Sequence, residues 1–379
     1  MSGRVIIVTG ASSGIGQKAA EYLCERGDNV ILACRNAERG QATVDRIKKK
    51  NPEALAHFME LDLASVESIR KFVEAFHATG KKLHVLVNNA GMSLGFKSTK
   101  RETTTDGFEI TFGTNHLGPF LLTNLLLDDL KQTAEETGDA RVIMVASSAH
   151  DKATMGRRFR VVDMDMEDLH LVKPGAFTGV QAYKDSKASN IMFMRKLAKD
   201  LDGTNVSINA MCPGFIPSTG LGRNNPAGIK VLMKLFSVLR PVMKTIKTVE
   251  HGANMIYELA DEEKFKGVTG KYLVDLEEGE SSEETRDEEK IEKLWQMSGG
   301  YLKMDGFEPL DVPEPPPEPE PETAKEETVK EEKTEDKKVE EAKTDDAKED
   351  EAKDEKDETT KGEMEPEDKD NDAKEIKDE

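Results

Sequence analysis

The stretch from Arg4 to Gly16, RVIIVTGASSGIG, constrains the fold of this chain more than any other. It begins with a β-branched run, Val5 to Val8, that is typical of a strand buried on both faces. The run ends at Thr9-Gly10, and two further glycines precede a helical pattern from Gln17 to Arg26. Because glycine lets a backbone approach a diphosphate and a helix start offers unpaired N–H groups, the stretch predicts a phosphate-binding turn. A tight strand-to-helix turn without a ligand would show the same glycines.

Buried-strand and helical patterns alternate along most of the remaining chain. This alternation predicts an α/β fold, a doubly wound Rossmann-type parallel sheet of about seven strands with helices on both faces. The C-terminal helix, Glu283 to Met297, is expected to end at Ser298-Gly299-Gly300. The other strands are expected at residues 29–34, 54–60, 83–87, 141–146, 206–211 and 270–274, and the other long helices at 37–50, 65–78 and 182–201.

Charge separates a body from a tail. The chain has 379 residues and a formal net charge of −20, and residues 311–379 hold 31 acidic and 13 basic side chains, a balance of −18. This segment has almost no large apolar residues, so it cannot bury enough surface to offset the entropy of ordering. We therefore expect one domain over residues 1–310 and a disordered acidic tail over 311–379, which either keeps the protein soluble or recruits a partner.

Composition also narrows the class of protein. The three cysteines, Cys24, Cys34 and Cys212, are odd in number and show no metal-ligand spacing, which favours reduced thiols and no metal site. The sequence shows no signal peptide, no apolar run long enough to span a bilayer, and no basic stripe with interleaved aromatic residues. These observations predict a cytoplasmic protein without a transmembrane span that does not bind nucleic acid.

Arg35 directly follows the second predicted strand, where a dinucleotide-binding fold meets the adenosine ribose. An acidic residue there would bind the 2′-hydroxyl of NAD(H), whereas an arginine pairs with the 2′-phosphate of NADP(H). The sequence has Arg35-Asn36 and no acid, which favours NADP(H), although an arginine that only faces solvent fits the same position. Asp62, at the end of the third predicted strand, is placed to meet the adenine amine.

Tyr183 and Lys187 are four residues apart in a predicted helix and so share one face. A phenol ionises near pH ~10, and a nearby ammonium together with an oxidised nicotinamide is expected to lower that pKa, which makes Tyr183 a candidate acid/base group. Ser148, at the end of a predicted parallel strand, is placed to donate a hydrogen bond to a substrate carbonyl oxygen. His116 and His150 are assigned supporting roles, because Tyr183 already fills the acid/base role.

In chain order, T-G-x-x-x-G-I-G, N-N-A-G, a helical Asn115, a strand-end serine, Y-x-x-x-K and P-G resemble the short-chain dehydrogenase/reductase family throughout the body. The resemblance implies a catalytic tetrad: Tyr183 passes the proton and Ser148 holds the carbonyl. Lys187 binds the nicotinamide ribose, and Asn115 supports a water relay to it. In the family's paired-serine motifs the second serine is catalytic, which selects Ser148 over Ser147. The implied cofactor contacts are Gly10, Ser12, Ser13, Gly14, Ile15, Gly16, Arg35, Asp62, Asn89, Ala90, Gly91, Tyr183, Lys187, Pro213, Gly214, Ile216 and Thr219.

Two groups within the family share further motifs with this chain. A-C-R, S-S-A-H and T-N-H-L-G-P-F resemble retinol dehydrogenases, while T-D-G-F-E and A-Y-K-D-S-K resemble light-dependent protochlorophyllide reductase; both groups use NADP(H). The pigment reductases carry cysteines where this chain has Ser189 and Phe215, which weighs against the photochemical reaction. The resemblance therefore implies an oxidoreductase that transfers hydride between NADP(H) and a carbonyl or alcohol of a lipophilic, retinoid-like molecule. The alternatives are a protochlorophyllide-reductase-like double-bond reductase and a cofactor-binding scaffold that recruits partners through its tail.

Residues 229–247, IKVLMKLFSVLRPVMKTIK, are apolar and basic and contain no acid. They predict a lid, about residues 215–247, that closes over a lipophilic substrate and whose basic face can rest on an anionic membrane surface. Pro241 is incompatible with one long helix there. A helix pair packed on the core, or on a second copy of the chain in a homodimer, fits the same pattern.

Overall fold

The computed structural model describes residues 3–95, 97–155, 159–219, 228, 246–261 and 263–315. Backbone contacts divide the chain into two units, residues 1–318 and 319–379. The second unit lies outside the described residues, as do most of the predicted lid and all of the predicted tail beyond residue 315.

Within the described residues, eight strands form one sheet in the order β3-β2-β1-β4-β5-β6-β7-β8. All neighbours from β3 to β7 pair in parallel, and the two-residue β8 pairs antiparallel with β7. The predicted doubly wound parallel sheet is confirmed, with a short antiparallel strand added at its edge. The strand order reverses between β1 and β4, which opens a crevice at their carboxyl ends. The strands are β1 (Val5–Thr9), β2 (Asn29–Cys34), β3 (Ala56–Glu60), β4 (Val85–Asn88), β5 (Ala140–Val145), β6 (Val206–Cys212), β7 (Tyr272–Val274) and β8 (Glu277–Glu278).

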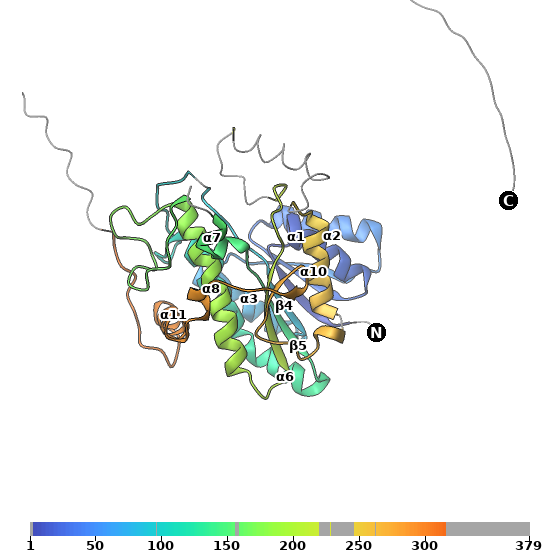
Figure 1. The fold of residues 1–379 in the computed structure, drawn as a ribbon. Coiled ribbons are helices and arrows are strands. Elements are labelled where there is room, and N and C mark those ends of the chain that lie inside the picture. Colours follow the sequence, from blue (N-terminus) through green and yellow to red (C-terminus); the bar gives the residue numbers. More distant parts are fainter. Residues whose placement is uncertain are drawn as a thin grey trace, which may run out of the picture. The chain divides into compact units, whose positions relative to one another are not determined.

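Helices cover both faces of the sheet (Figure 1). One apolar cluster joins the sheet to α1, α2 and α10, and the other joins it to α3, α5, α6, α8 and α11. No helix within the described ranges is long and apolar enough to cross a bilayer. The α-helices are α1 (Gly14–Glu25), α2 (Ala37–Lys50), α3 (Val66–Ala78), α4 (Ile110–Phe112), α5 (Gly118–Leu125), α6 (Leu127–Thr137), α7 (Lys152–Met155), α8 (Gly179–Asp200), α10 (Val249–Asp261) and α11 (Glu288–Tyr301). The shorter turns are the π-helical η1 (Gly113–Leu117) and the 3₁₀ turns η2 (Ser148–His150), η5 (Glu263–Phe265) and η6 (Glu283–Arg286).

The local sequence explains where the elements begin. Every residue of β1, β2, β5 and β6 is buried, and β1, β2 and β5 are almost uninterrupted apolar runs, whereas β6 also buries Ser207 and Asn209. Several helices begin at a polar N-cap whose side chain accepts a hydrogen bond from a backbone N–H of the first turn, including Asn36 for α2, Ser65 for α3, Thr178 for α8 and Asp287 for α11. The helix that carries Tyr183 therefore begins at a position set by its own sequence.

The C-terminal helix α11 does not end at its two glycines, as the sequence led us to expect. It continues to Tyr301, with Gly299 and Gly300 inside it. A Cβ at Gly299 would lie 2.2 Å from the ring of Phe307, and one at Gly300 would lie 2.5 Å from the carbonyl oxygen of Glu308. The two glycines therefore leave room for the chain segment after the helix to pack against it. In the sequence, glycines with this packing role look the same as glycines that end a helix.

Candidate active site

Thr9 fastens the ends of β1 and β4 together at the crevice. Its hydroxyl donates to the carbonyl oxygen of Val87 at 3.1 Å and accepts from the N–H groups of Asn89 and Ala90 at 3.0 Å. The amide of Asn89 donates in turn to the carbonyl oxygen of Thr9 at 2.8 Å. The N-N-A-G segment is thus held beside the glycine turn by a residue that the sequence-based site did not include.

Two glycines of the first turn are required by close packing. A Cβ at Gly10, whose φ is +68°, would lie 2.9 Å from the Cα of Ala90. One at Gly16 would lie 2.3 Å from Nδ2 of Asn89. Side chains at either place would force the β1–α1 turn away from the end of β4 and widen the crevice.

The start of α1 has the features of an anion site. Gly14 begins the helix at φ +58°, and a Cβ there would meet nothing closer than Thr219 Cγ2 at 4.0 Å. The N-cap residue Ser13 makes no side-chain cap hydrogen bond, and the first turn contains no acidic residue. The first N–H groups of α1 therefore lack a side-chain acceptor, and the free space beside Gly14 suits the diphosphate of a dinucleotide.

Two other residues of the turn have roles in packing. The Ser12 side chain hydrogen-bonds the Cys34 thiol at the end of β2. Ile15 and Pro213 both pack against Gly252 of α10, where an added Cβ would lie 3.2 Å from each of them.

Arg35 stands at the end of β2 with its side chain 70% exposed. Its Nη1 is 3.8 Å from Oδ2 of Asp62, a long contact between partly solvated groups that contributes little. The other oxygen of Asp62 accepts from the N–H of Ala64 at 3.0 Å, which orients the carboxylate at the end of β3. Both predicted adenosine-side residues therefore lie together, and the guanidinium keeps donors for a phosphate.

The end of β5 and the start of α8 bring the candidate catalytic side chains together. Tyr183 hydrogen-bonds the side chain of Ser147. Lys187 Nζ donates to the carbonyl oxygen of Val145 at 2.8 Å and lies 5.8 Å from the centroid of the Tyr183 ring. A serine, a tyrosine and a lysine thus meet at the carboxyl end of the parallel sheet.

Ser147 and Ser148 have different surroundings, and the catalytic role assigned to Ser148 from the sequence stays a prediction. Ser148 is exposed, and its N–H donates to Sγ of Cys212 at 3.1 Å, whereas Ser147 is the serine bonded to Tyr183. The β5 ladder ends at Val145 and η2 begins at Ser148, with Ser147 as its N-cap, so the two serines occupy different positions in the turn. The hydroxyl of Ser147 also accepts from the N–H of Ala149 at 3.1 Å, which fixes its place at the start of the turn.

Burial sets the pKa values of the pair. It raises the pKa of Tyr183 to about 12, against which the hydrogen bond from Ser147 acts. It lowers the pKa of Lys187 to about 8, with the nearby Cys212 acting in the opposite direction. In the protein by itself desolvation disfavours both charged forms, and the lowering of the Tyr183 pKa expected from Lys187 together with an oxidised nicotinamide stays a prediction for the cofactor complex.

Asn115 joins the β4 end to α8 from within the π-helical turn η1. Its Oδ1 accepts from the N–H of Met92 at 2.8 Å, and its Nδ2 donates to the carbonyl oxygen of Met92 at 2.9 Å and to Oγ of Ser186 at 3.0 Å. A Cβ at Gly91 would lie 3.4 Å from Lys187 Nζ and 3.6 Å from Asn115 Oδ1. Gly91 therefore gives both polar groups access to the same space.

This site agrees with the comparisons with known proteins. Residues 4–158 match the family model described as short chain dehydrogenase, and residues 171–275 match the model described as Enoyl-(Acyl carrier protein) reductase. Retinol dehydrogenase 12 of Mus musculus is 36% identical over 296 residues, which cover 78% of this chain and 85% of that protein. The chain belongs to the short-chain dehydrogenase/reductase family.

Two further proteins illustrate the range of the family. Short-chain dehydrogenase TIC 32 B, chloroplastic, of Brassica napus is 35% identical over 296 residues, or 77% of this chain and 86% of that one. Among solved structures, the Pseudomonas aeruginosa RhlG/NADP active-site complex aligns with a TM-score of 0.55 and 27% identity, covering 72% of this chain and 95% of that one. Oxidoreductase chemistry with a nicotinamide cofactor is thus the activity of this family.

The remaining cofactor positions that this family implies follow β6. Gly214 has a φ of +77°, and a Cβ there would lie 2.5 Å from Lys247 Cγ, so a side chain is excluded on both grounds. Ile216 is 7% exposed, and its carbonyl oxygen accepts from the N–H and hydroxyl of Thr219 at 3.3 and 3.1 Å. This turn places Thr219 near Gly14, at the end of residues 215–219, the first described stretch of the predicted lid.

Two histidines contact the site indirectly. His116 is fully buried, its Nε2 is 2.9 Å from Oγ of Ser298, and burial lowers its pKa to about 3. His150 Nδ1 lies 2.7 Å from the carbonyl oxygen of Ser147, and burial lowers the pKa of this ring as well. Burial therefore disfavours the charged form of both rings.

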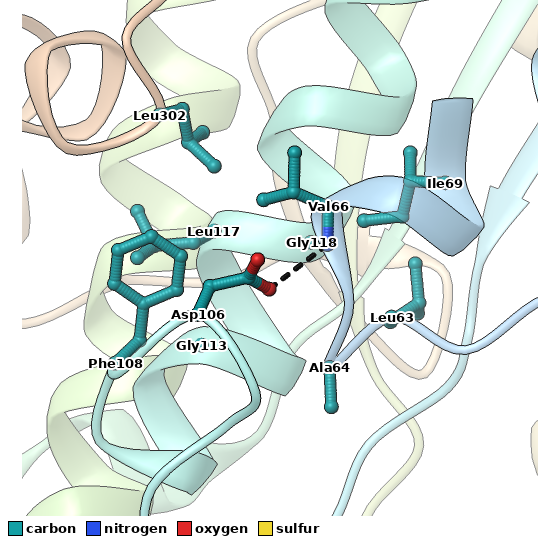
Figure 2. A pocket seen from close by; sticks show the side chains of 10 residues that line it. All are labelled: Leu63, Ala64, Val66, Ile69, Asp106, Phe108, Gly113, Leu117, Gly118 and Leu302. Carbon is teal, nitrogen blue, oxygen red and sulfur yellow. Dashed lines mark hydrogen bonds between the residues drawn. The ribbon is translucent and has the colours of Figure 1, made fainter.

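Figure 2 shows a small hollow whose lining is mainly apolar and includes one ionisable side chain, that of Asp106. Its free volume is about 10 Å³, enough for about one water molecule. The carboxylate of Asp106 accepts a hydrogen bond from the N–H of Val66 at 2.9 Å, so it has a structural role at the start of α3. The hollow is lined by Leu63, Ala64, Val66, Ile69, Asp106, Phe108, Gly113, Leu117, Gly118 and Leu302.

Proposed function

We propose that the protein is an NADP(H)-dependent oxidoreductase that transfers hydride between the nicotinamide and a carbonyl or alcohol group of a lipophilic small molecule, retinoid-like or another aldehyde or ketone. The observation that carries the proposal is the Ser147–Tyr183 hydrogen bond one helical turn from Lys187, beside the glycine turn of α1. When bound, the nicotinamide cofactor supplies or accepts the hydride.

Each side chain has a defined part in carbonyl reduction. The phenol of Tyr183 gives its proton to the carbonyl oxygen while the carbonyl carbon gains the hydride, and alcohol oxidation returns that proton to the phenolate. Because the pKa of Tyr183 is about 12, the group is protonated near neutrality and available as a donor. In this proposal Ser147, which is bonded to Tyr183, holds the same oxygen in place of the Ser148 predicted from the sequence. Lys187, which shares the space beside Gly91 with Asn115, binds the nicotinamide ribose.

Arg35 supports the preference for NADP(H). Its exposed guanidinium ends β2, at the edge where the adenosine ribose lies in this type of fold. Guanidinium groups bind phosphate oxygens through charge-assisted hydrogen bonds, which a 2′-hydroxyl cannot match. The solved relative from Pseudomonas aeruginosa is itself a complex with NADP.

Apolar residues near the site support a lipophilic substrate. Val162 is 62% exposed although its backbone is bonded to Gln181, two residues before Tyr183. Phe215, which follows Gly214, is 43% exposed. Retinol dehydrogenase 12, a relative over most of the chain, is named for a lipophilic alcohol.

The purified protein tests this function with a panel of lipophilic aldehydes and ketones, followed by NADPH absorbance. Tyr183→Phe should lower kcat by roughly 10²-fold or more, because it removes the proton donor. The control, Tyr257→Phe on α10, changes a tyrosine whose ring contacts Tyr22 outside the site, and should keep wild-type turnover. Equal rates for wild type and Tyr183→Phe would refute the mechanism, and no turnover of any compound by wild type would refute the substrate class.

A further inference from the structure

A buried charged cluster lies on the other side of α8 from Tyr183. The side chain of Lys184 is fully buried, and its Nζ contacts Oδ1 of Asp185 at 3.3 Å and Oε1 of Glu284 in η6. The carboxylates of Asp185 and Glu284 are only 6% and 2% exposed. Burying ions costs several kcal/mol for each charge, so the gain in stability from such a cluster is small at best and does not by itself explain it.

The cluster fixes α8 to a neighbouring segment. At about 100° per residue, Gln181, Lys184 and Asp185 lie on a different side of the helix from Tyr183. Gln181 accepts from the N–H of Val162 at 2.9 Å and donates to its carbonyl oxygen at 3.0 Å. It also donates to both oxygens of Asp185, at 2.9 and 3.0 Å. The orientation of the first turn of α8 about the helix axis is therefore set by hydrogen bonds on the side of the helix away from Tyr183.

Glu284 is the link to the C-terminal part of the chain. Its second oxygen accepts from the N–H of Met164 at 2.8 Å, so one side chain holds Lys184 and the 162–164 segment together. Burial raises the pKa of Asp185 to about 7, the charge of Lys184 opposes this, and Glu284 adds to it. Two carboxylates thus share one ammonium, and each contact depends on the others.

The same short segment also supports the serine. The N–H of Ser282 donates to Nε2 of His150 at 3.1 Å, which leaves the Nδ1–H of that ring to donate to the carbonyl oxygen of Ser147 at 2.7 Å. The His150 ring packs edge-on against Tyr272, with centroids 5.0 Å apart. Residues 282–284 therefore contact the supports of both partners in the Ser147–Tyr183 hydrogen bond.

We propose that Glu284, acting through Lys184, is a positioning residue that holds the Tyr183 hydroxyl against Ser147. This inference rests on the proposed function of the same site. Glu284 touches no reacting atom, and its effect is on the orientation of α8 relative to the end of β5. A displacement of about 1 Å at a reacting group can lower the rate by as much as 10²-fold.

Glu284→Gln tests the proposal, since it keeps the shape and an oxygen for Met164 but removes the charge that meets Lys184. We expect kcat to fall by roughly tenfold or more, with the KM of the carbonyl substrate and the Kd of NADPH within about twofold of wild type. The matched control is Glu288→Gln, which breaks an exposed ion pair between Lys199 of α8 and α11 and should leave all three constants unchanged. A Glu284→Gln enzyme with wild-type kcat would overturn the proposal.

The double variant Lys184→Met/Glu284→Gln separates positioning from stability. It removes the charges of Lys184 and Glu284 together, while the introduced amide oxygen can still accept from the N–H of Met164 and Asp185 keeps its bonds to Gln181. We expect its Tm to be near that of wild type while kcat stays low, because the bonds that orient α8 are gone. Recovery of kcat together with Tm would show that the cluster only stabilises the fold, and would overturn the proposal.

A measurement that does not depend on catalysis tests the positioning role separately from the proposed function. If wild type reduces no carbonyl, the proposed function fails. The positioning role is then judged by hydrogen exchange at the amides of Val162 and Met164, which the cluster holds. Faster exchange in Glu284→Gln than in Glu288→Gln supports it, and equal exchange in the two overturns it.

Discussion

Ser147 and Ser148 are chemically identical neighbours, and only one of them meets Tyr183. Successive side chains at the end of a strand point to opposite sides, so the direction of each depends on where the ladder stops. Here β5 stops at Val145 and the next turn begins at Ser148. Which serine contacts Tyr183 therefore depends on a backbone detail that a residue pattern does not contain.

Replacing Ser147 with alanine should lower kcat for carbonyl reduction by roughly 10²-fold or more, because a hydrogen-bond donor is lost where charge develops on the substrate oxygen. Ser148→Ala is the matched control and should keep kcat within about twofold, since its side chain is exposed. Steady-state rates of the two variants make the comparison. A larger loss for Ser148→Ala would restore the assignment made from the sequence.

The ionisation of Lys187 should appear in the pH dependence of reduction. A lysine is charged below its pKa, and burial lowers that of Lys187 to about 8. The value of kcat/KM, which reports the free enzyme, should therefore fall as pH rises through about 8, while Tyr183 stays protonated. Rates measured across this range check the prediction. A profile that stays flat well above pH 8 would show that the charge of Lys187 is not needed.

Arg35→Ala should weaken NADPH much more than NADH. Hydrogen bonds to charged groups contribute about 1.5–3 kcal/mol, which corresponds to a roughly 10- to 150-fold change in Kd for the phosphorylated cofactor. Lys71→Ala removes a cation of equal exposure, 70%, from α3 and serves as the control. Fluorescence titration with both nucleotides measures the ratio. An unchanged NADPH-to-NADH preference in Arg35→Ala would contradict the cofactor proposal.

At the scale of the element, α11 shows how a local signal can have a tertiary meaning. Glycine pairs commonly end helices, yet Gly299 and Gly300 lie inside this one because residues 307–310 pack against them. The helix is also held by Trp295, whose ring stacks on Phe193 at 5.8 Å and meets Phe120 edge-on at 5.0 Å. It therefore covers α5 and α8, the helix that carries Tyr183.

Gly300→Ala should destabilise the protein although alanine favours helix formation by about 1 kcal/mol over glycine. The new Cβ would lie 2.5 Å from the backbone oxygen of Glu308, and such overpacking costs about 1–3 kcal/mol. Lys290→Ala, a surface change in the same helix, should alter the free energy of unfolding by less than about 0.5 kcal/mol. Urea unfolding of both variants provides the measurement. Greater stability of Gly300→Ala would mean that the segment after α11 moves aside.

At the scale of the whole molecule, the parallel sheet collects distant residues at one edge. The β1–α1 turn, the N-N-A-G segment, Ser147 and Tyr183 all follow the carboxyl ends of strands or face them, around the β1/β4 reversal of strand order. The segment 282–284 joins them from far along the chain, through His150 and Lys184. The site is thus a property of the topology, to which each segment contributes only one or two groups.

Local spacing was enough to predict much of this arrangement. The β-branched runs and glycines between Arg4 and Gly16 determined a buried strand, a turn and a helix start, because backbone sterics and burial act over a few residues. The i, i+4 spacing of Tyr183 and Lys187 determined that they share a helix face. The alternation of such units determined the doubly wound sheet.

Only the tertiary structure decided the remaining features, since they depend on groups that are distant in sequence. It placed Ser147 in contact with Tyr183, raised the pKa of Tyr183 through burial, and placed Glu284 beneath α8. Desolvation, side-chain direction at a strand end and contact between remote segments are consequences of packing. Residue spacing along the chain carries no measure of them.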